Sequence, residues 1–167
     1  CDRLIARIRR QCLPDVRLPR YGDGDWDDSL QPADPLLRER MVSAWTSELL
    51  YQTLRRYAAG LRRFGRSARA DVADEFADAV AADFQRHLVP GGVVAGFAVF
   101  DGARAVEYLL HPSDQRTGLK YRLIPMTRGI LAGIFSPEQA RRHLDLLHEH
   151  LVFPDGARLM DRPTAYE

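Results

Sequence analysis

The sequence has no hydrophobic run long enough to cross a membrane. Its longest apolar stretch, Leu88 to Phe100, is interrupted by Pro90 and three glycines, whereas a spanning helix needs about 20 predominantly apolar residues. The chain also has no charged and then apolar N-terminal segment of the kind that forms a signal peptide. We therefore expect a cytoplasmic location and no membrane contact from this segment.

Cysteine and lysine are scarce, and neither sign of charge dominates. Cys1 and Cys12 would lie about 16 Å apart along a helix, too far for a disulfide, so we interpret them as ordinary thiols of a reducing compartment. Lys120 is the only lysine among 24 basic residues, a bias typical of a GC-rich bacterial genome. The formal net charge of +1 gives no general attraction to nucleic acid or to an anionic membrane.

Apolar residues are abundant enough for one core. They make up 46% of the 167 residues and charged residues 28%, a composition that excludes intrinsic disorder. The chain opens on Cys1 without an initiator Met and stops without a closing element. We therefore interpret 1–167 as a single piece of something larger, with no internal boundary.

Helical periodicity accounts for most of the sequence. Apolar residues recur at helical spacing, with Asp34, Ser67 and Ser136 as capping residues at helix starts. Ser136 begins a capping box, and Gly60 is expected to end the second helix. The expected helices cover 1–13, 35–59, 68–88, 125–134 and 137–151.

The period changes between 93 and 110. This stretch is rich in β-forming residues around Asp101-Gly102, and we predict a β-hairpin with those two residues as its turn. Residues 14–33 and 111–119 are predicted loops, and the tail after Phe153 is predicted coil. The expected class is mainly α, with helices joined by short loops into antiparallel hairpins.

The densest cluster of chemically useful side chains is the loop segment Tyr-Gly-Asp-Gly-Asp-Trp-Asp-Asp-Ser at 21–29. Four carboxylates and Trp26 lie within the six residues 23–28. Crowded carboxylates repel one another, which favours protonation of one of them near neutral pH, as a general acid requires. An indole beside them offers a face for a sugar ring. The segment is therefore a candidate sugar site.

Two other interpretations of this segment stay open on the residues alone. The alternating aspartates over 23–27 resemble the opening of a calcium loop, with Asp34 at the place of the last ligand. However, Asp28 and Asp34 stand where such loops have a turn glycine and a bidentate glutamate. Alternatively, the segment is a solvated loop whose Trp26 packs into the core. We expect no bound metal.

The segment Gly24-Asp25-Trp26-Asp27-Asp28 is similar to the Gly-Asp-Trp-Asn-Asp signature of the inverting disaccharide phosphorylases. That family includes cellobiose and chitobiose phosphorylases and the C-terminal module of cyclic β-1,2-glucan synthases. The resemblance is colinear from about 20 to 160. It continues in Ser43-Ala44-Trp45, in the hairpin ending at Phe100-Asp101-Gly102, in Pro125-Met126 with Gly133, and in Ser136-Pro137-Glu138-Gln139-Ala140.

The resemblance implies a fold and roles for particular residues. The chain would form part of an (α/α)6 barrel of helical hairpins, with the hairpin around 93–110 inserted. Asp28 would be the general acid, and Trp26 would line the sugar site next to the cleaved bond. Asp25 and Asp27 would also contact substrate, although Asp27 departs from the family's Asn and so leaves the sugar undetermined.

The resemblance also implies a reaction. Inverting phosphorolysis of a β-glucoside would give a sugar 1-phosphate, with inorganic phosphate as co-substrate and no cofactor. An inverting hydrolase needs a second carboxylate to activate water, whereas phosphate is itself a nucleophile. The family's phosphate-binding residues cannot be placed on this chain. We therefore expect the isolated chain to be inactive and to associate with the remainder of a longer polypeptide or with itself.

Three alternatives to this reaction remain at the level of sequence. The chain could belong to the phosphorylase-like module of a cyclic β-1,2-glucan synthase, and so to a soluble part of an inner-membrane enzyme. It could belong to an inverting glycoside hydrolase. It could also be a non-catalytic helical module that binds calcium or sugar.

The predicted loop 111–118 holds two weaker candidates. Arg116 and Thr117 carry donors suited to an anion or to sugar hydroxyls. A polar turn in which Ser113 and Asp114 satisfy local backbone groups is the competing interpretation.

Two further expectations concern the helices. Histidines 87, 143, 148 and 150 lie at or near predicted helix ends, where we expect solvated, helix-dipole roles. About five helices cannot close a barrel of twelve, so two apolar faces should be partly uncovered. These are Phe76/Val80/Phe84 and Leu144/Leu147/Leu151.

Overall fold

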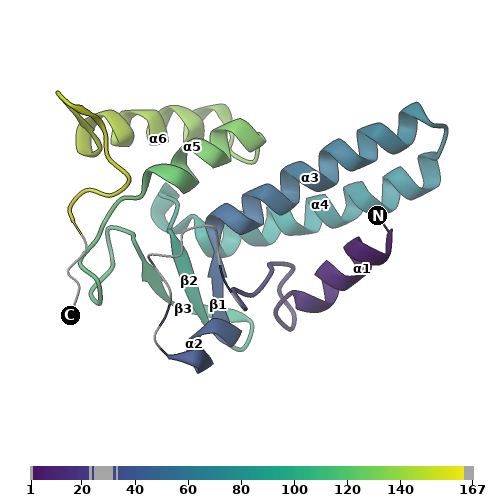
Figure 1. Cartoon of the computed structure of the whole chain (residues 1–167), viewed down its shortest axis with the longest axis horizontal. Helices are drawn as coiled ribbons and strands as arrows, with labels where there is room; N and C mark the ends of the chain where they lie inside the picture. The colour runs from purple at the N-terminus through teal and green to yellow at the C-terminus, as the bar shows by residue number, and fades with distance from the viewer. Residues whose placement is uncertain (1, 23, 25–31, 33, 164–167) are drawn as a thin grey trace.

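The computed structural model describes residues 2–22, 24, 32 and 34–163. These residues are mainly helical and include a small antiparallel sheet (Figure 1). The helices are α1 (Asp2–Gln11), α2 (Pro35–Arg40), α3 (Ala44–Arg63), α4 (Ser67–Leu88), α5 (Leu123–Ala132) and α6 (Pro137–His150), with a 3-10 turn, η2, at Pro90–Gly92. The strands are β1 (Met41–Ser43), β2 (Phe97–Asp101), β3 (Arg104–Leu109), β4 (Val152–Phe153) and β5 (Gly156–Ala157).

The predicted helix over 35–59 is two helices separated by β1. Asp34 caps α2 as predicted, but Met41–Ser43 is extended and pairs with β2. Ser43 then caps α3, its Oγ accepting the Thr46 N–H at 3.4 Å. An apolar Met41-Val42 pair satisfies helical and strand patterns equally, so the break depends on the partner strand. Helix α3 also continues through Gly60, and the turn is made instead at Gly65, with φ +67°.

The predicted hairpin is confirmed as β2 and β3, and β1 extends it to a three-stranded sheet in the order β1-β2-β3. The closing pair is Asp101↔Arg104, so the turn is Gly102-Ala103, one residue later than predicted. Gly102 takes φ +62°, a conformation that favours glycine. The coil predicted after Phe153 instead contains the short ladder β4-β5.

The sheet separates two apolar clusters. Its inner face, with Val42, Ala98 and Phe100, joins the main core formed with α3, α4, α5 and α6. Its outer face, with Phe97 and Val99, joins what we call the outer-face cluster. The outer-face cluster consists of Tyr21, Leu37, Met41, Phe97, Val99, Leu109, Leu110 and Leu119. Burial of a large side chain such as Phe84 or Phe100 contributes about 1.5–3 kcal/mol to folding.

The first of the two apolar faces predicted to be uncovered is buried. Phe76 is 3% exposed, and Val80 and Phe84 are fully buried, so the prediction was wrong for this face. Ile5 and Ile8 of α1 pack against the same core, and the Arg9 guanidinium lies 4.5 Å from the centre of the Phe76 ring. The N-terminal helix and the sheet supply cover that counting helices alone did not include.

The second face is covered for the most part. Leu147 and Leu151 are buried in the main core, and only Leu144 is substantially exposed, at 44%. The expectation of a large open face on α6 was therefore also wrong.

The paired helices α5 and α6 follow the sequence prediction closely. Ser136 and Gln139 form the predicted capping box, and Gly133 ends α5 with φ +71°. Gly129 lies inside α5 against Phe135, where a Cβ would be 2.2 Å from a ring carbon. The six helices found in the described residues are consistent with helical hairpins, and membership of an (α/α)6 barrel stays a proposal. Among the described residues, no helix combines the length and apolarity that a membrane crossing requires.

Candidate functional site

The predicted general acid and sugar-binding residues lie outside the described part of the chain. Asp28, Trp26, Asp25 and Asp27 belong to 25–31, which the structure does not describe. Their assignments therefore stay predictions. The structure does describe the two stems of this segment, which are Tyr21 and Gly22 before it and Asp34 after it.

Both stems are attached where α2 meets β1. The Tyr21 N–H donates to the Met41 carbonyl at 2.7 Å, and the Gly22 N–H donates to the Arg38 carbonyl at 3.1 Å. On the other side, Asp34 Oδ1 accepts the Leu36 N–H at 2.9 Å. The signature segment thus leaves and rejoins the fold beside one edge of the sheet.

The outer face of the sheet packs against the first of these stems through the outer-face cluster. The Tyr21 ring meets Phe97 edge-on, with 5.9 Å between ring centres. The Arg122 guanidinium lies 5.0 Å from the centre of the same ring. Arg122 is only 3% exposed, so a cation, two aromatic rings and the first stem are packed together.

Two segments distant in sequence complete this end of the sheet. Arg122 pairs with Met160 in an isolated antiparallel bridge, and Asp161 Oδ1 accepts the backbone N–H groups of Lys120 and Tyr121 at 2.9 and 3.1 Å. Met160 packs on the outer-face cluster, to which Leu119 belongs. The structure therefore brings together 20–22, 119–122 and 159–161.

The loop 111–118 adjoins the outer-face cluster, and hydrogen bonds to the Asp114 carboxylate hold its backbone. Its Oδ1 accepts the N–H groups of Arg116 and Thr117 at 2.8 and 2.9 Å, and its Oδ2 accepts from the Leu110 N–H and the Thr117 hydroxyl. Burial raises the pKa of the Asp114 carboxyl, but the hydrogen bonds from Thr117, Leu110 and Arg116 outweigh it, so the net pKa is lowered. Asp114 is thus a buried, ionised carboxylate that satisfies local backbone groups.

Arg116 and Thr117, the predicted substrate contacts in this loop, are held in different ways. Arg116 Nε binds Glu107 Oε1 at 2.9 Å, and the Arg116 side chain is 54% exposed. The Thr117 hydroxyl donates to Asp114 and accepts the Leu119 N–H at 3.1 Å, so it is engaged inside the loop. Both remain predictions as substrate-binding residues.

Sequence reasoning missed two buried charged residues. Glu48 is fully buried on α3, one turn after Ser43-Ala44-Trp45, and Arg122 is 3% exposed. Asp114, which the polar-turn interpretation named, is 5% exposed. For Glu48 the available signal was a carboxylate at a core position of an amphipathic helix. Charged side chains are rarely fully buried unless they are paired, so we expect each of these positions to serve the structure or a function.

The solvated role predicted for His143 was wrong. His143 is fully buried in the interior of α6, where its Nε2 accepts the Val94 N–H at 3.0 Å and its Nδ1 lies 2.7 Å from the Gln139 carbonyl. It stacks on Phe135 with 4.3 Å between ring centres. Burial lowers the pKa of His143, which keeps the imidazole neutral.

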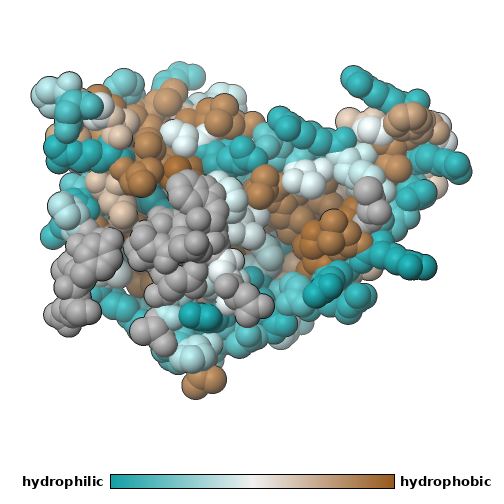
Figure 2. Space-filling model, viewed as in Figure 1, coloured by the Kyte–Doolittle hydropathy of each residue, from teal (hydrophilic) through white to brown (hydrophobic). Residues whose placement is uncertain are grey.

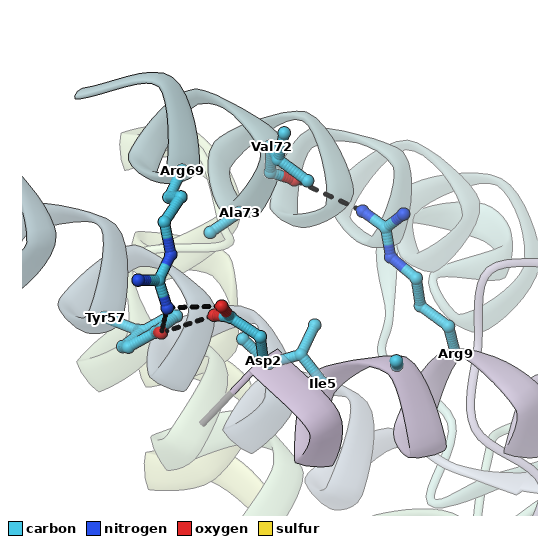
Figure 3. Close-up of a pocket in the computed structure, with 8 residues that line it drawn as sticks. Asp2, Ile5, Arg9, Tyr57, Arg69, Val72 and Ala73 are labelled. Carbon is cyan, nitrogen blue, oxygen red and sulfur yellow. Dashed lines mark hydrogen bonds and ion pairs between the residues drawn. The ribbon is translucent and has the colours of Figure 1, made fainter. Parts of the chain in front are cut away.

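A pocket of about 230 Å³ lies on the other side of the molecule, between α1 and the α3–α4 hairpin (Figure 3). Ile5, Val72 and Ala73 are among its apolar lining residues, and Figure 2 shows hydrophobic residues gathered over this junction. At one end, Asp2 accepts hydrogen bonds from Arg69 and Tyr57. The Arg69 guanidinium lowers the pKa of Asp2, so this carboxylate is unsuited to act as a general acid.

A metal centre receives no support from the part of the chain that the structure describes. There, no three His, Cys, Asp or Glu side chains converge in a way that could hold an ion. Cys12 is a free thiol whose pKa is raised to about 11 by burial. This thiol is therefore neutral and a poor metal ligand.

Comparison with known proteins identifies one informative relative. No family model matches the sequence. The chain is 39% identical over 163 residues to a protein of Listeria innocua serovar 6a named 1,2-beta-oligoglucan phosphorylase. The match covers 97% of this chain and 14% of that protein. Along nearly its whole length, this chain is therefore similar to part of a phosphorylase, which agrees with the resemblance carried by the 24–28 segment.

Proposed function

We propose that this chain is part of the catalytic region of an inverting glycoside phosphorylase that acts on β-1,2-linked glucan oligosaccharides. The observation that carries the proposal is the 39% identity to a 1,2-beta-oligoglucan phosphorylase over 163 residues, a stretch that includes the signature at 24–28. Since the chain spans 14% of that relative, the activity is proposed for the longer polypeptide. The linkage follows from the relative's name, and the reaction class also follows from the signature.

In this proposal, Asp28 is the general acid. A phosphate oxygen attacks the anomeric carbon from the face opposite the leaving group, and the bond from that carbon to the glycosidic oxygen breaks. Asp28 gives its proton to that oxygen, which leaves as the hydroxyl of the shortened glucan. Inversion at a β-linked carbon yields an α-sugar 1-phosphate. In the reverse direction, Asp28 removes the proton of the acceptor hydroxyl.

The neighbouring residues bind the sugar in this scheme. Trp26 stacks on the ring next to the cleaved bond, and Asp25 and Asp27 accept hydrogen bonds from its hydroxyls. The charge of Asp27 beside Asp28 disfavours ionisation of the acid. Arg116 and Thr117 are weaker candidates for contacts with substrate.

The described stems support this role for the segment between them. The backbone N–H groups of Tyr21 and Gly22 donate to β1 and α2 at 2.7 and 3.1 Å, and the Asp34 side chain accepts the Leu36 N–H of α2 at 2.9 Å. A catalytic acid needs such anchoring because a displacement of about 1 Å can reduce the rate about 10²-fold. Beside the first stem, Arg122 and Tyr21 are buried against Phe97.

Phosphate dependence is the test. The full-length protein is incubated with β-1,2-glucan oligosaccharides, with and without inorganic phosphate, and sugar 1-phosphate is quantified. We expect product only with phosphate, and none from β-1,4-linked oligosaccharides used as the linkage control. Reducing sugar released equally without phosphate would replace the proposal with an inverting hydrolase. Binding without any cleavage would leave only a sugar-binding module.

The chain by itself is expected to be inactive. Phosphorolysis requires cationic and amide donors for the phosphate, and the family's set cannot be placed on these residues. Phosphorolysis by residues 1–167 alone would show that the phosphate site lies within them.

A further inference from the structure

The chain leaves β3 through a strained residue. Leu110 is 2% exposed and has φ +53°, in the left-handed region that a side chain of this kind rarely adopts. Such conformations persist only where the surroundings fix them, and they cluster at functional sites. We therefore looked for the groups that hold Leu110.

Hydrogen bonds at its N–H group and at its carbonyl group both hold the Leu110 backbone. Asp114 Oδ2 accepts the Leu110 N–H at 2.8 Å, and the Leu110 carbonyl accepts the Gly96 N–H at 3.2 Å. Gly96 has no room for a side chain, because a Cβ there would lie 2.9 Å from Leu110 Cβ. The left-handed turn is thus specified by Asp114 and by the close approach of Gly96, the residue before β2.

The same carboxylate holds the far side of the loop. Its two oxygens together bind the N–H groups of Arg116 and Thr117 and the Thr117 hydroxyl, which in turn accepts the Leu119 N–H. Leu110 and Leu119, at the two ends of the loop, both belong to the outer-face cluster with Tyr21. Tyr21 is the residue from which the signature segment starts.

We propose that Asp114 is a positioning residue for the first stem of the signature segment: by fixing Leu110 and Leu119, it holds the outer-face cluster to which Tyr21 belongs. Its importance for catalysis rests on the proposed function, whereas its hold on Tyr21 does not. Asp114 acts through the loop and the cluster and has no assigned contact with substrate.

The test is Asp114→Asn in the full-length protein. The amide oxygen of Asn can still accept from Arg116 and Thr117, but an NH₂ group would face the Leu110 N–H. The matched control is Asp83→Asn, since Asp83 Oδ2 also accepts a backbone N–H, from Arg17 at 2.6 Å, on the main-core side. Thr117→Val is a milder second variant that removes one hydroxyl and leaves the backbone contacts of Asp114.

The first readout is hydrogen exchange of the Tyr21 and Gly22 amides, which donate to Met41 and Arg38. We expect exchange about tenfold faster in Asp114→Asn, a smaller acceleration in Thr117→Val, and none in Asp83→Asn. Unchanged Tyr21 and Gly22 exchange in the first two variants would overturn the positioning role, whether or not the protein is a phosphorylase.

The second readout is the kinetics of phosphorolysis. We expect kcat to fall about tenfold in Asp114→Asn with KM for glucan nearly unchanged, because a displaced acid slows chemistry more than binding. Unchanged kcat despite faster exchange would overturn the catalytic part of the proposal. Faster exchange in a protein whose wild type lacks phosphorolysis would instead refute the proposed function. If Asp114→Asn does not fold, Thr117→Val decides both readouts.

Discussion

The α3–α4 hairpin and the outer end of the sheet both carry charged side chains, but they place them differently. On the hairpin, Arg55 and Arg62 both bind Asp74, and these side chains remain 36%, 46% and 22% exposed. At the sheet end, Asp114 and Arg122 are almost fully buried. The hairpin also buries Ser47 and Glu48 near the start of α3, whereas none of the buried polar residues found in the described part of the chain lies in α1 or α4.

This difference affects how closely the fold fixes the position of a charged side chain. Exposed ion pairs contribute little to stability, because water and salt screen them. A buried carboxylate must have its hydrogen bonds supplied by the fold, so its position is specified closely. The buried carboxylate at the sheet end therefore suits a site that needs fixed geometry better than the exposed ion pairs of the hairpin do.

The largest effect is expected from the signature segment, whose stems are attached at the sheet end. Asp28→Asn in the full-length protein should lower phosphorolysis about 10²–10⁴-fold, because an amide cannot protonate the leaving oxygen. Glucan affinity and the melting temperature should change little. Turnover and affinity are measured separately. Retention of more than about a tenth of the activity would remove Asp28 from the role of general acid.

Two glycine-to-alanine changes compare packing in α5 with packing in the α3–α4 hairpin. In Gly129→Ala, the new Cβ would be 2.2 Å from a Phe135 ring carbon, and we expect a loss of about 1–3 kcal/mol. Gly60 of α3 has no atom within 4 Å of such a Cβ, so Gly60→Ala should gain about 0.5–1 kcal/mol in helix stability. Denaturant unfolding of both variants checks this. If both variants changed the free energy of unfolding equally little, the Phe135 ring would move aside at low cost.

The pH dependence should report the buried histidines. Burial lowers the pKa of His143 and of His111, so both are neutral in the folded protein. Below about pH 6.5 the unfolded chain binds protons that the folded chain does not, and stability must therefore fall as the pH drops. Thermal unfolding between pH 7.5 and 5 should show this decline.

A variant of His143 sharpens this measurement. In His143→Gln, the amide oxygen can accept the Val94 N–H without titrating, so the decline with falling pH should be shallower than in the wild type. An unchanged slope would assign the decline to other groups.

The smallest effect is expected at the pocket under α1. Asp2→Asn removes an exposed contact with Arg69, whose side chain is 50% exposed. Surface pairs of this kind are nearly neutral, so neither the melting temperature nor phosphorolysis should change measurably. A clear loss of activity would show that the α3–α4 hairpin takes a direct part in phosphorolysis. The two regions would then not differ in function as proposed.

Local signals in the sequence were sufficient for much of the fold. The capping box at Ser136 and Gln139, the helix start at Asp34 and the hairpin over 97–109 are confirmed. These features depend on contacts within a few residues, which sequence spacing reveals. The family resemblance likewise needed only a contiguous signature at 24–28, and the similarity to a phosphorylase agrees with it.

Tertiary structure decided the features that depend on distant partners. Met41–Ser43 became a strand because β2 lies beside it, and His143 became a core residue because Val94 and Phe135 meet it. The contacts of Asp114 within its loop are local and match the polar-turn interpretation, whereas the packing of Leu110 and Leu119 in one cluster with Tyr21 depends on the whole fold. Sequence periodicity reports which face of a segment is apolar, but which segments meet is set by the packing of the whole chain, where burial and hydrogen bonding must be satisfied together.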